Sequence, residues 1–395
     1  MWRNRIILLL LIISSGIFVS IYGGSFPYAF FYSMLMVPLL AFAYTLYVYV
    51  RFKLYQSTGA KTLVKGESAD YSFLLENEDL ITFESLKVNF YHDRSRVLNV
   101  DESREYCLLP KQKVELATRI CCDYRGDYYV GVRSIVITDF LYLFRITYPV
   151  RQALPVTVLP RVVHLEAFPA LNMEMDSKYQ GNGRNAEEEP DAEVRKYAAG
   201  DSLKRIHWKV SARRQEWMTR KYVESPQSRI SIVMDLSGMD KGEGDSIGIE
   251  DKILEAVLAV ADYYLAKKIL LQIFYQQQKT ERMEISTEEN FNEFYQRCAH
   301  FRFQAGYQAA DVLRECMPYI LGTGHLLIVT HQLDDMLFKE LDRLANKGGR
   351  AVVIVAASGE SDERQQIRIS LEQQGIRVIE ILTGQEVKDR LEQRD

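Results

Sequence analysis

Two long hydrophobic runs at the N-terminus constrain this chain more than any other feature. The first, IILLLLIISSGIFVSIY, covers residues 6–22, and the second, YAFFYSMLMVPLLAFAYTLYVYV, covers residues 28–50. Neither run contains a charged side chain, and a helix needs about 20 such residues to cross the hydrocarbon core of a bilayer. The first run is near the lower limit of that length, and membrane helices tolerate a proline such as Pro38. We predict two transmembrane helices, 6–22 and 28–50, within an N-terminal region of residues 1–55.

The first run has a second interpretation, a cleaved signal peptide. We favour a retained hairpin because the run is long for a signal peptide and no clear small-x-small cleavage site follows it. Arg3 and Arg5 precede the hairpin, Arg51 and Lys53 follow it, and the loop between the runs is uncharged. The positive-inside rule then puts both ends in the cytoplasm. We expect a multi-pass membrane protein in which the residues after 50 are cytoplasmic.

Residues 60–160 have the pattern of a β domain. Apolar and polar side chains alternate in several short segments, and turn signals such as Asn77-Glu78-Asp79 and Arg125-Gly126-Asp127 recur between them. No long helical period interrupts the alternation. The pattern predicts an antiparallel β-sandwich of immunoglobulin-like type, although a small barrel would produce a similar sequence.

The C-terminal region, residues 229–395, follows a polar connector predicted over residues 161–191. Apolar strand-like runs, among them RISIVMDLS, ILLQIFYQ, HLLIVTHQ, RAVVIVAA and RVIEIL, alternate with amphipathic helical segments. This alternation predicts an α/β domain built on a doubly wound parallel sheet. Such sheets bind ligands beyond the carboxyl ends of their strands. The residues expected there are Asp235, Ser237, Thr330, His331 and Gln332.

The loop after the first of these strands, Asp235-Leu236-Ser237-Gly238-Met239, resembles the Asp-x-Ser-x-Ser loop of von Willebrand factor A domains. In those domains the loop holds a divalent cation, and carboxylate and hydroxyl oxygens suit magnesium. Met239 replaces the last oxygen donor, and no acid follows Thr330 where a further ligand would be expected. We therefore predict a degenerate metal site at Asp235 and Ser237. Magnesium binding stays open, and a capping role for Asp235 is the simpler interpretation.

A basic segment, residues 192–228, lies between the connector and this domain. Its centre, RKYAAGDSLKRIHWKVSARRQEWMTRKY, covers residues 195–222. The sequence predicts a turn at 197–200, a helix over 202–213 and a strand over 216–224, with Arg205, Lys209 and Arg213 at every fourth position of the helix. We expect a structural junction whose cations pair with acids of the connector and of the α/β domain. The remaining cations would be available to a partner.

Three other roles for the basic segment were weighed. Asp201, His207 and either Ser202 or Ser211 contain the groups of a hydrolase relay, but no nucleophile elbow or oxyanion-hole signature accompanies them. Packing of His207 and Trp208 against the adjacent domain is the simpler interpretation. Binding of nucleic acid or anionic lipid is the third role. The chain has 49 Lys and Arg against 53 Asp and Glu, so no nucleic-acid partner is expected.

The basic segment also resembles the signature of the bacterial family called domain of unknown function 58, R-x-Y-x-x-G-D-x-x-R-x-I-H-W-K-x-S-A-R. The matching residues are Arg195, Tyr197, Gly200, Asp201, Ile206, His207, Trp208, Lys209, Ser211, Ala212 and Arg213. Upstream, residues 125–145 resemble the family's element in which a turn precedes DPFGLF-like residues. The resemblance extends over the hairpin, the β domain, the signature and the von Willebrand A-like end.

The family resemblance implies a partner rather than a reaction. The family has no firmly assigned activity, and its members are thought to act as partners or adaptors for MoxR-type AAA+ ATPases. They are commonly encoded beside those ATPases and beside transglutaminase-like membrane proteins. We therefore expect a scaffold or adaptor of the bacterial cell membrane that binds a protein through the strand ends around Asp235 and Ser237. It would need no catalysis of its own, and a hydrolase that uses Asp201 and His207 is the alternative.

Overall fold

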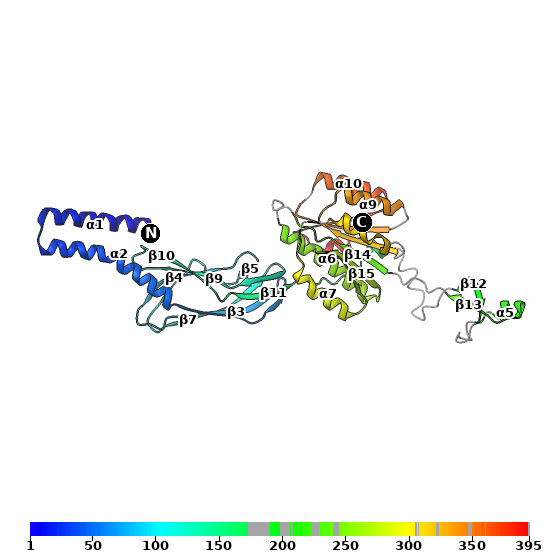
Figure 1. Ribbon diagram of the computed structural model, residues 1–395, viewed down its shortest axis with the longest axis horizontal. Coiled ribbons are helices and arrows are strands. Elements are labelled where there is room, and N and C mark those ends of the chain that lie inside the picture. The colour runs from blue at the N-terminus through cyan, green and yellow to red at the C-terminus, as the bar shows by residue number, and fades with distance from the viewer. Residues whose placement is uncertain are drawn as a thin grey trace. The chain divides into compact units, whose positions relative to one another are not determined.

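The computed structural model describes residues 1–172, 190–197, 206, 208–222, 229–239, 245–304, 306, 308–320, 324–346, 350–359 and 361–393. The chain divides into two compact units, an N-terminal unit, Met1–Arg161, and a C-terminal unit, Val162–Asp395 (Figure 1). Each unit is described by itself below.

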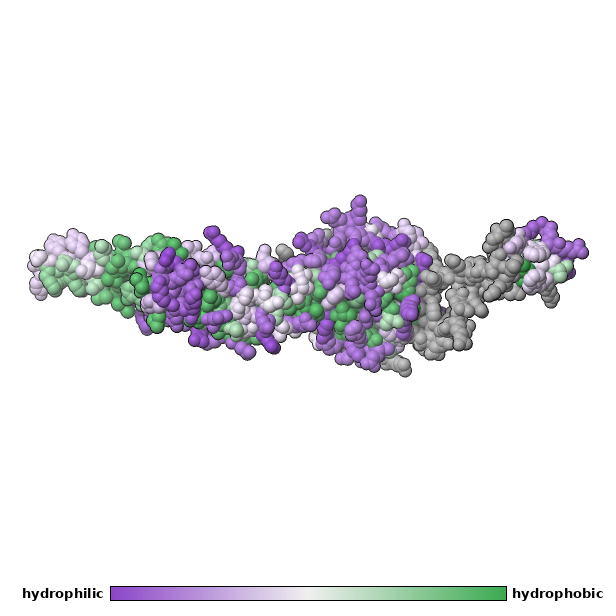
Figure 2. All heavy atoms as spheres, turned by 90° about the horizontal axis from the view of Figure 1, so that it is seen from below, coloured by the Kyte–Doolittle hydropathy of each residue, from purple (hydrophilic) through white to green (hydrophobic). Residues whose placement is uncertain are grey.

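The N-terminal unit begins with a helical hairpin. Helix α1 covers Trp2–Tyr22 and helix α2 covers Ser25–Arg51, so both predicted hydrophobic runs lie within helices. The turn between them places Gly23 at φ 58° and Gly24 at φ 88°, backbone conformations that glycine adopts without a steric penalty. The helices pack side by side in Figure 1, and hydrophobic residues cover most of the hairpin in Figure 2. Both helices are long and apolar enough to cross a membrane.

The rest of the N-terminal unit is a β body of three sheets. The first sheet has the order β1-β3-β7-β5, the second β10-β9-β4-β6 and the third β2-β11-β8. All pairs are antiparallel except β2 with β11. The strands are β1 (Lys53–Thr58), β2 (Thr62–Val64), β3 (Ser68–Glu76), β4 (Phe83–Phe90), β5 (Ser95–Val97), β6 (Glu105–Leu108), β7 (Lys113–Cys122), β8 (Gly126–Val130), β9 (Val132–Thr138), β10 (Arg145–Pro149) and β11 (Leu154–Leu159).

One hydrophobic core joins the sheets of the β body. The buried ring of Phe73 on β3 meets Phe90 on β4 and Tyr106 on β6 in edge-on contacts, with centroids 5.8 Å and 6.2 Å away. Strand β3 alternates between exposed and buried residues over most of its length, as a sheet with one solvated face requires. The predicted β-rich body is therefore confirmed.

The C-terminal unit is built on a six-stranded sheet of order β16-β15-β14-β17-β18-β19. The pairs from β15 to β19 are parallel, and β16 is an antiparallel edge strand. The strands are β14 (Arg229–Met234), β15 (Leu270–Gln276), β16 (Thr280–Ile285), β17 (Gly324–Thr330), β18 (Arg350–Ala357) and β19 (Arg377–Leu382). The helices are α3 (Pro169–Asn172), α6 (Ser246–Ala266), α7 (Glu288–His300), α8 (Ala309–Ile320), α9 (Asp335–Asn346), α10 (Asp362–Gln373) and α11 (Val387–Glu392).

Helices cover both faces of this sheet (Figure 1). Helices α6, α7 and α11 contribute to one core together with strand residues such as Ile232. Helices α8, α9 and α10 contribute to a second core with strand residues such as Val233. Because successive strand residues point to opposite faces, a strand buried on both sides must be apolar at nearly every position. The continuous run at the start of the C-terminal domain has this pattern for that reason.

The first part of the predicted polar connector, residues 161–191, contributes to the core of the C-terminal unit. Phe168 is fully buried there, and its ring makes edge-on contacts with Tyr263 and Tyr264 on α6. Val163 and Leu171 belong to the same core. The polar composition of residues 173–189 dominates the sequence pattern and conceals these three apolar side chains, but residues 173–189 lie outside the described residues.

The basic segment contains a small two-stranded sheet. Strand β12 (Pro190–Lys196) pairs antiparallel with β13 (Met218–Tyr222), and helix α5 (Trp208–Arg214) lies between them in sequence. The helix predicted over residues 202–213 is wrong at its start, because Ile206 forms an antiparallel β-bridge with Thr219. Both residues are buried. Pairing with a neighbouring segment outweighs the helical spacing of the apolar residues at this point.

Candidate functional site

The candidate site lies where β14 and β17 end. These neighbouring parallel strands place Met234 beside Val329, and the backbone N–H of Asp235 donates to the carbonyl of Val329 at 2.9 Å. Asp235 and Thr330, which are far apart in sequence, therefore meet at the carboxyl edge of the sheet. This juxtaposition is the one that the strand pattern predicts.

The Asp235 carboxylate is buried and already engaged. One oxygen, Oδ1, accepts from the hydroxyl of Ser237 at 2.6 Å and from its backbone N–H at 2.9 Å. The other, Oδ2, accepts from the Thr330 hydroxyl at 2.6 Å. The Thr330 hydroxyl in turn accepts from the backbone N–H of Gln332. Ser237 also forms a parallel β-bridge with Gln304. The carboxylate thus joins the loop after β14 to the loop after β17, and the bridge of Ser237 adds the segment after α7.

The imidazole of His331 is a further neighbour of this carboxylate. Its Nδ1 lies 3.4 Å from Asp235 Oδ2, its side chain is 1% exposed, and neither ring nitrogen has a hydrogen-bond partner in the described part of the chain. Burial alone would raise the pKa of the Asp235 carboxyl group. The interaction with His331, together with hydrogen bonds from Ser237 and Thr330, outweighs burial and lowers that pKa.

The described donors at this loop are fewer than those of the loop it resembles, and magnesium binding stays a prediction. Hard cations need several oxygen ligands. The described ones are the carboxylate of Asp235 and the hydroxyls of Ser237 and Thr330, which hydrogen-bond to one another in this structure. Met239 packs against the hydrophobic core. The carboxylate of Asp245 caps α6 by accepting from the Gly248 N–H. Among the described residues, no group of three His, Cys, Asp or Glu side chains could hold a metal.

Next to the buried carboxylate lies an open hollow of about 800 Å³ beyond the ends of β17 and β18. His331 connects the two, because it faces Asp235 and also lines the hollow. The outer edge combines an apolar side chain, Met336 (46% exposed), with the carboxylates of Asp335 and Glu363. Neither carboxylate forms an ion pair with a residue that the structure describes. We call Gln332, Asp335, Met336, Ser358 and Glu363 the rim.

Four of the five rim residues, all except Gln332, are absent from the residues predicted at the strand ends. Asp335 and Met336 follow β17 by a few positions, and Ser358 and Glu363 follow β18 in the same way. Because ligands bind beyond the carboxyl ends of parallel strands, the end of β18 predicts Ser358 and Glu363 as site residues. Asp335 and Met336 lie further along the loop after β17 than the residues expected there.

The signature segment is held together by its own contacts. The ring of Tyr197 packs edge-on against Trp217, with the centroids 5.6 Å apart, and the backbone N–H of Tyr197 donates to the Trp217 carbonyl. The buried hydroxyl of Ser211 accepts from the Met218 N–H at 2.9 Å, which ties α5 to β13. Lys196 pairs with Glu216 within the segment. Ser211 thus has a structural role in the segment.

Other signature residues are exposed or fall outside the described parts. Trp208 is 67% exposed and Trp217 is 57% exposed, and Arg213 is exposed as well. Gly200, Asp201, Arg205 and His207 lie outside the described residues, as do the side chains of Arg195 and Lys209. The predicted interaction role of this set therefore stays a prediction, and so does the hydrolase relay.

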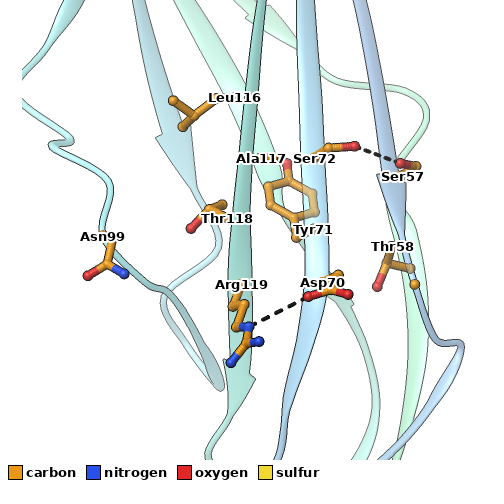
Figure 3. Close-up of a pocket in the computed structure, with 11 residues that line it drawn as sticks. Ser57, Thr58, Asp70, Tyr71, Ser72, Asn99, Leu116, Ala117, Thr118 and Arg119 are labelled. Atoms are coloured by element: carbon orange, nitrogen blue, oxygen red, sulfur yellow. Dashed lines mark hydrogen bonds and ion pairs between the residues drawn. The ribbon is translucent and has the colours of Figure 1, made fainter.

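A second hollow lies on the β body of the N-terminal unit, over β1, β3 and β7 (Figure 3). Its polar side chains pair locally, Ser57 with Ser72 at 2.9 Å and Arg119 with Asp70 at 3.5 Å. Both members of the Arg119–Asp70 pair are largely exposed to solvent. Nothing buried and charged converges on this hollow, so it is a weaker candidate than the strand ends of the C-terminal unit.

Comparison with known proteins gives one informative result. No curated protein sequence matches the chain. Among solved structures, the chain is similar to Cwp6 from Clostridium difficile (13% identity, TM-score 0.17, covering 83% of this chain and 49% of that one). It is also similar to a GH20 exo-β-N-acetylglucosaminidase from Vibrio harveyi (8% identity, TM-score 0.16, covering 84% of this chain and 57% of that one). The chain thus spans about half the length of either structure, and TM-scores this low support no conclusion about fold. Residues 193–268, from β12 to the end of α6, match the family model described as "Protein of unknown function DUF58", which supports the family indicated by the signature segment.

Proposed function

We propose that this chain is a membrane-anchored scaffold or adaptor that binds a protein partner at the rim and performs no catalysis. The observation that carries the proposal is the state of Asp235. Its carboxylate, the group that would act as a metal ligand or a catalytic acid at these strand ends, is buried. It accepts hydrogen bonds that join the loops. What remains accessible beside it is a surface of acidic and apolar side chains. Such a surface is suited to recognition.

The partner should present basic and apolar side chains. The rim exposes two carboxylates in the first turns of α9 and α10, and Met336 supplies an adaptable apolar contact. The family resemblance implies a MoxR-type AAA+ ATPase as that partner, and a transglutaminase-like membrane protein is the other candidate.

Each of the two units has features of a known architecture. The C-terminal strand order, with an antiparallel strand at one edge and helices on both faces, supports the proposal of a doubly wound, von Willebrand A-like domain. The sheets that share a core in the N-terminal unit suit an immunoglobulin-like sandwich. The hairpin would span the bacterial cell membrane with both ends in the cytoplasm, as the positions of Arg3, Arg5 and Arg51 favour.

Reversing the charge of the rim tests the proposed partner. We expect the double variant Asp335→Lys, Glu363→Lys to reduce recovery of the ATPase from native membranes by at least about tenfold, since about 1.4 kcal/mol of lost attraction suffices. The matched control is Glu288→Lys, Glu289→Lys, which reverses two exposed acids in the first turn of α7. Purification in magnesium and in EDTA should give the same result. Equal recovery of the ATPase by both double variants would remove the rim as the binding surface.

A further inference from the structure

The loops at one end of the β body expose a group of large apolar side chains. Five residues between 39% and 82% exposed belong to the group: Leu80, Ile81, Leu109, Phe140 and Tyr142. Only two other large apolar side chains of residues 52–161, Tyr55 and Tyr129, are exposed. Single exposed apolar residues are ordinary, but a group of them marks a binding surface. We call these five residues the loop collar.

The collar lies on three loops, residues 77–82, 109–112 and 139–144, which are joined to one another and to helix α2. The side chain of Asn77 donates to the carbonyls of Ile81 and Leu109, at 2.9 Å and 3.0 Å, which joins the first two loops. The hydroxyl of Tyr44 on α2 donates to the Thr82 carbonyl at 2.7 Å, and its ring packs edge-on against Phe140 at 5.4 Å. Two of the three loops of the collar therefore contact α2 at Tyr44.

The third loop also binds the first turn of α1. Asn4 donates to the Leu141 carbonyl at 2.8 Å, and Arg5 donates to the Leu143 carbonyl at 2.7 Å. At the other end of the contact region, Arg51 forms a bidentate pair with Asp79, next to Leu80. The loops therefore lie beside α2 from about Tyr44 to Arg51, and beside the start of α1.

Helix lengths place these loops relative to a bilayer. From Asn4 to Tyr22, α1 rises about 27 Å, close to the roughly 30 Å of a hydrocarbon core. With the Gly23–Gly24 turn at one border of the core, Asn4 and Arg5 arrive at the other border. Helix α2 is about 40 Å long, so its last 10 Å or so extends into the headgroup layer. That last part is where the collar lies.

We propose that the loop collar is a membrane-binding surface, inserted into the headgroup layer of the bilayer that α1 and α2 cross. This inference rests on the proposed membrane anchoring. Aromatic side chains such as Phe140 and Tyr142 are suited to this layer, where one side of a ring contacts acyl chains and a polar edge contacts water. The collar would hold the β body at a fixed depth, in addition to its covalent link to α2.

The backbone of Tyr142 gives independent support. It has φ 56°, a left-handed conformation that strains every residue except glycine, and the DPFGLF-like element that this loop resembles has glycine there. Its ring is 39% exposed, and its hydroxyl donates to Glu105 at 3.1 Å. An aromatic ring at a position that favours glycine contributes little to the core, and a lipid-facing role accounts for it.

Spin-label accessibility in the full-length protein tests the collar. The protein is reconstituted into vesicles of phosphatidylcholine and phosphatidylglycerol, in a background where Cys107→Ala and Cys121→Ser remove the two cysteines that are not buried. Nitroxides are attached at Leu80→Cys and Phe140→Cys in the collar, at Leu35→Cys in α2, and at Tyr129→Cys in β8. The signal is then relaxed by oxygen, which dissolves in lipid, and by a nickel chelate, which stays in water.

We expect the ratio of the oxygen effect to the nickel effect at positions 80 and 140 to lie between the high ratio at position 35 and the low ratio at position 129, because the headgroup layer lies between hydrocarbon and water. If positions 80 and 140 behave like 129 while 35 is lipid-exposed, the collar proposal is overturned and the membrane anchor stands. If position 35 itself is water-exposed, the anchor fails.

Discussion

Replacing Asp235 with alanine is expected to lower the free energy of unfolding of the C-terminal unit by about 3 kcal/mol. The variant removes a buried, charged acceptor that serves the hydroxyls of Ser237 and Thr330, and each such hydrogen bond contributes about 1.5 kcal/mol or more. In a unit of this size, a loss of about 3 kcal/mol lowers the melting temperature by about 10 °C. Differential scanning calorimetry of the detergent-solubilised protein measures it.

A matched control separates this effect from the loss of any aspartate. Asp262 on α6 binds the ring of His164 at 2.7 Å, but the His164 side chain is 80% exposed. Asp262→Ala should therefore cost less than about 1 kcal/mol, as exposed pairs do. A loss in Asp235→Ala no larger than in Asp262→Ala would show that the carboxylate does not fasten the loops.

The same carboxylate should make stability depend on pH. The pKa of Asp235 is lowered in the folded state, so its contribution to stability is present above the unfolded pKa of about 3.9. This contribution is lost as the pH falls through the lower, folded pKa, because the unfolded state then binds the proton more readily. The melting temperature of the wild type should fall more steeply below about pH 4 than that of Asp235→Ala.

Replacing Phe168 with alanine is expected to lower the free energy of unfolding by about 3–5 kcal/mol, the range for a fully buried phenylalanine. Phe168 is 0% exposed and fills the space beside Tyr263 and Tyr264. Truncation leaves a cavity against α6, which is itself buried over most of its length. Chemical denaturation followed by circular dichroism gives the free energy.

Ile369→Ala is the control for this second variant. Ile369 lies on α10 of the same unit and is 50% exposed, so its truncation should change the free energy by less than about 0.5 kcal/mol. If Phe168→Ala were equally mild, residues 162–172 would be dispensable for the core. The C-terminal unit would then begin later in the chain.

Whole helices and strands could be predicted from hydrophobic runs in the sequence. The hairpin follows from two uncharged runs, each of which lies within one helix. The parallel strands β14, β17 and β18 follow from largely apolar runs, because both of their faces are buried. The meeting of Asp235 and Thr330 follows in turn, since parallel neighbours end at the same edge.

Features that depend on one or two side chains could not be read in the same way. No sequence pattern shows that Thr330, 95 positions away, completes the hydrogen bonds of Asp235. Ile206 has helical spacing but pairs with Thr219, because tertiary pairing outweighs a weak local preference. Phe168 adjoins a polar stretch, and only its contacts reveal it as core. The collar needs the exposure of five residues from three loops, which sequence does not supply.

Crosslinking in living cells tests most directly whether the membrane-anchored chain binds a protein partner at its rim. A photo-reactive amino acid is placed at Met336 on the rim, and the control is placed at Tyr319, which is 60% exposed at the end of α8, before β17 begins. After irradiation, membrane adducts are identified by mass spectrometry. We predict that Met336 captures a MoxR-type AAA+ ATPase and that Tyr319 does not. Adducts to that ATPase at neither position, or equally at both, would contradict the account.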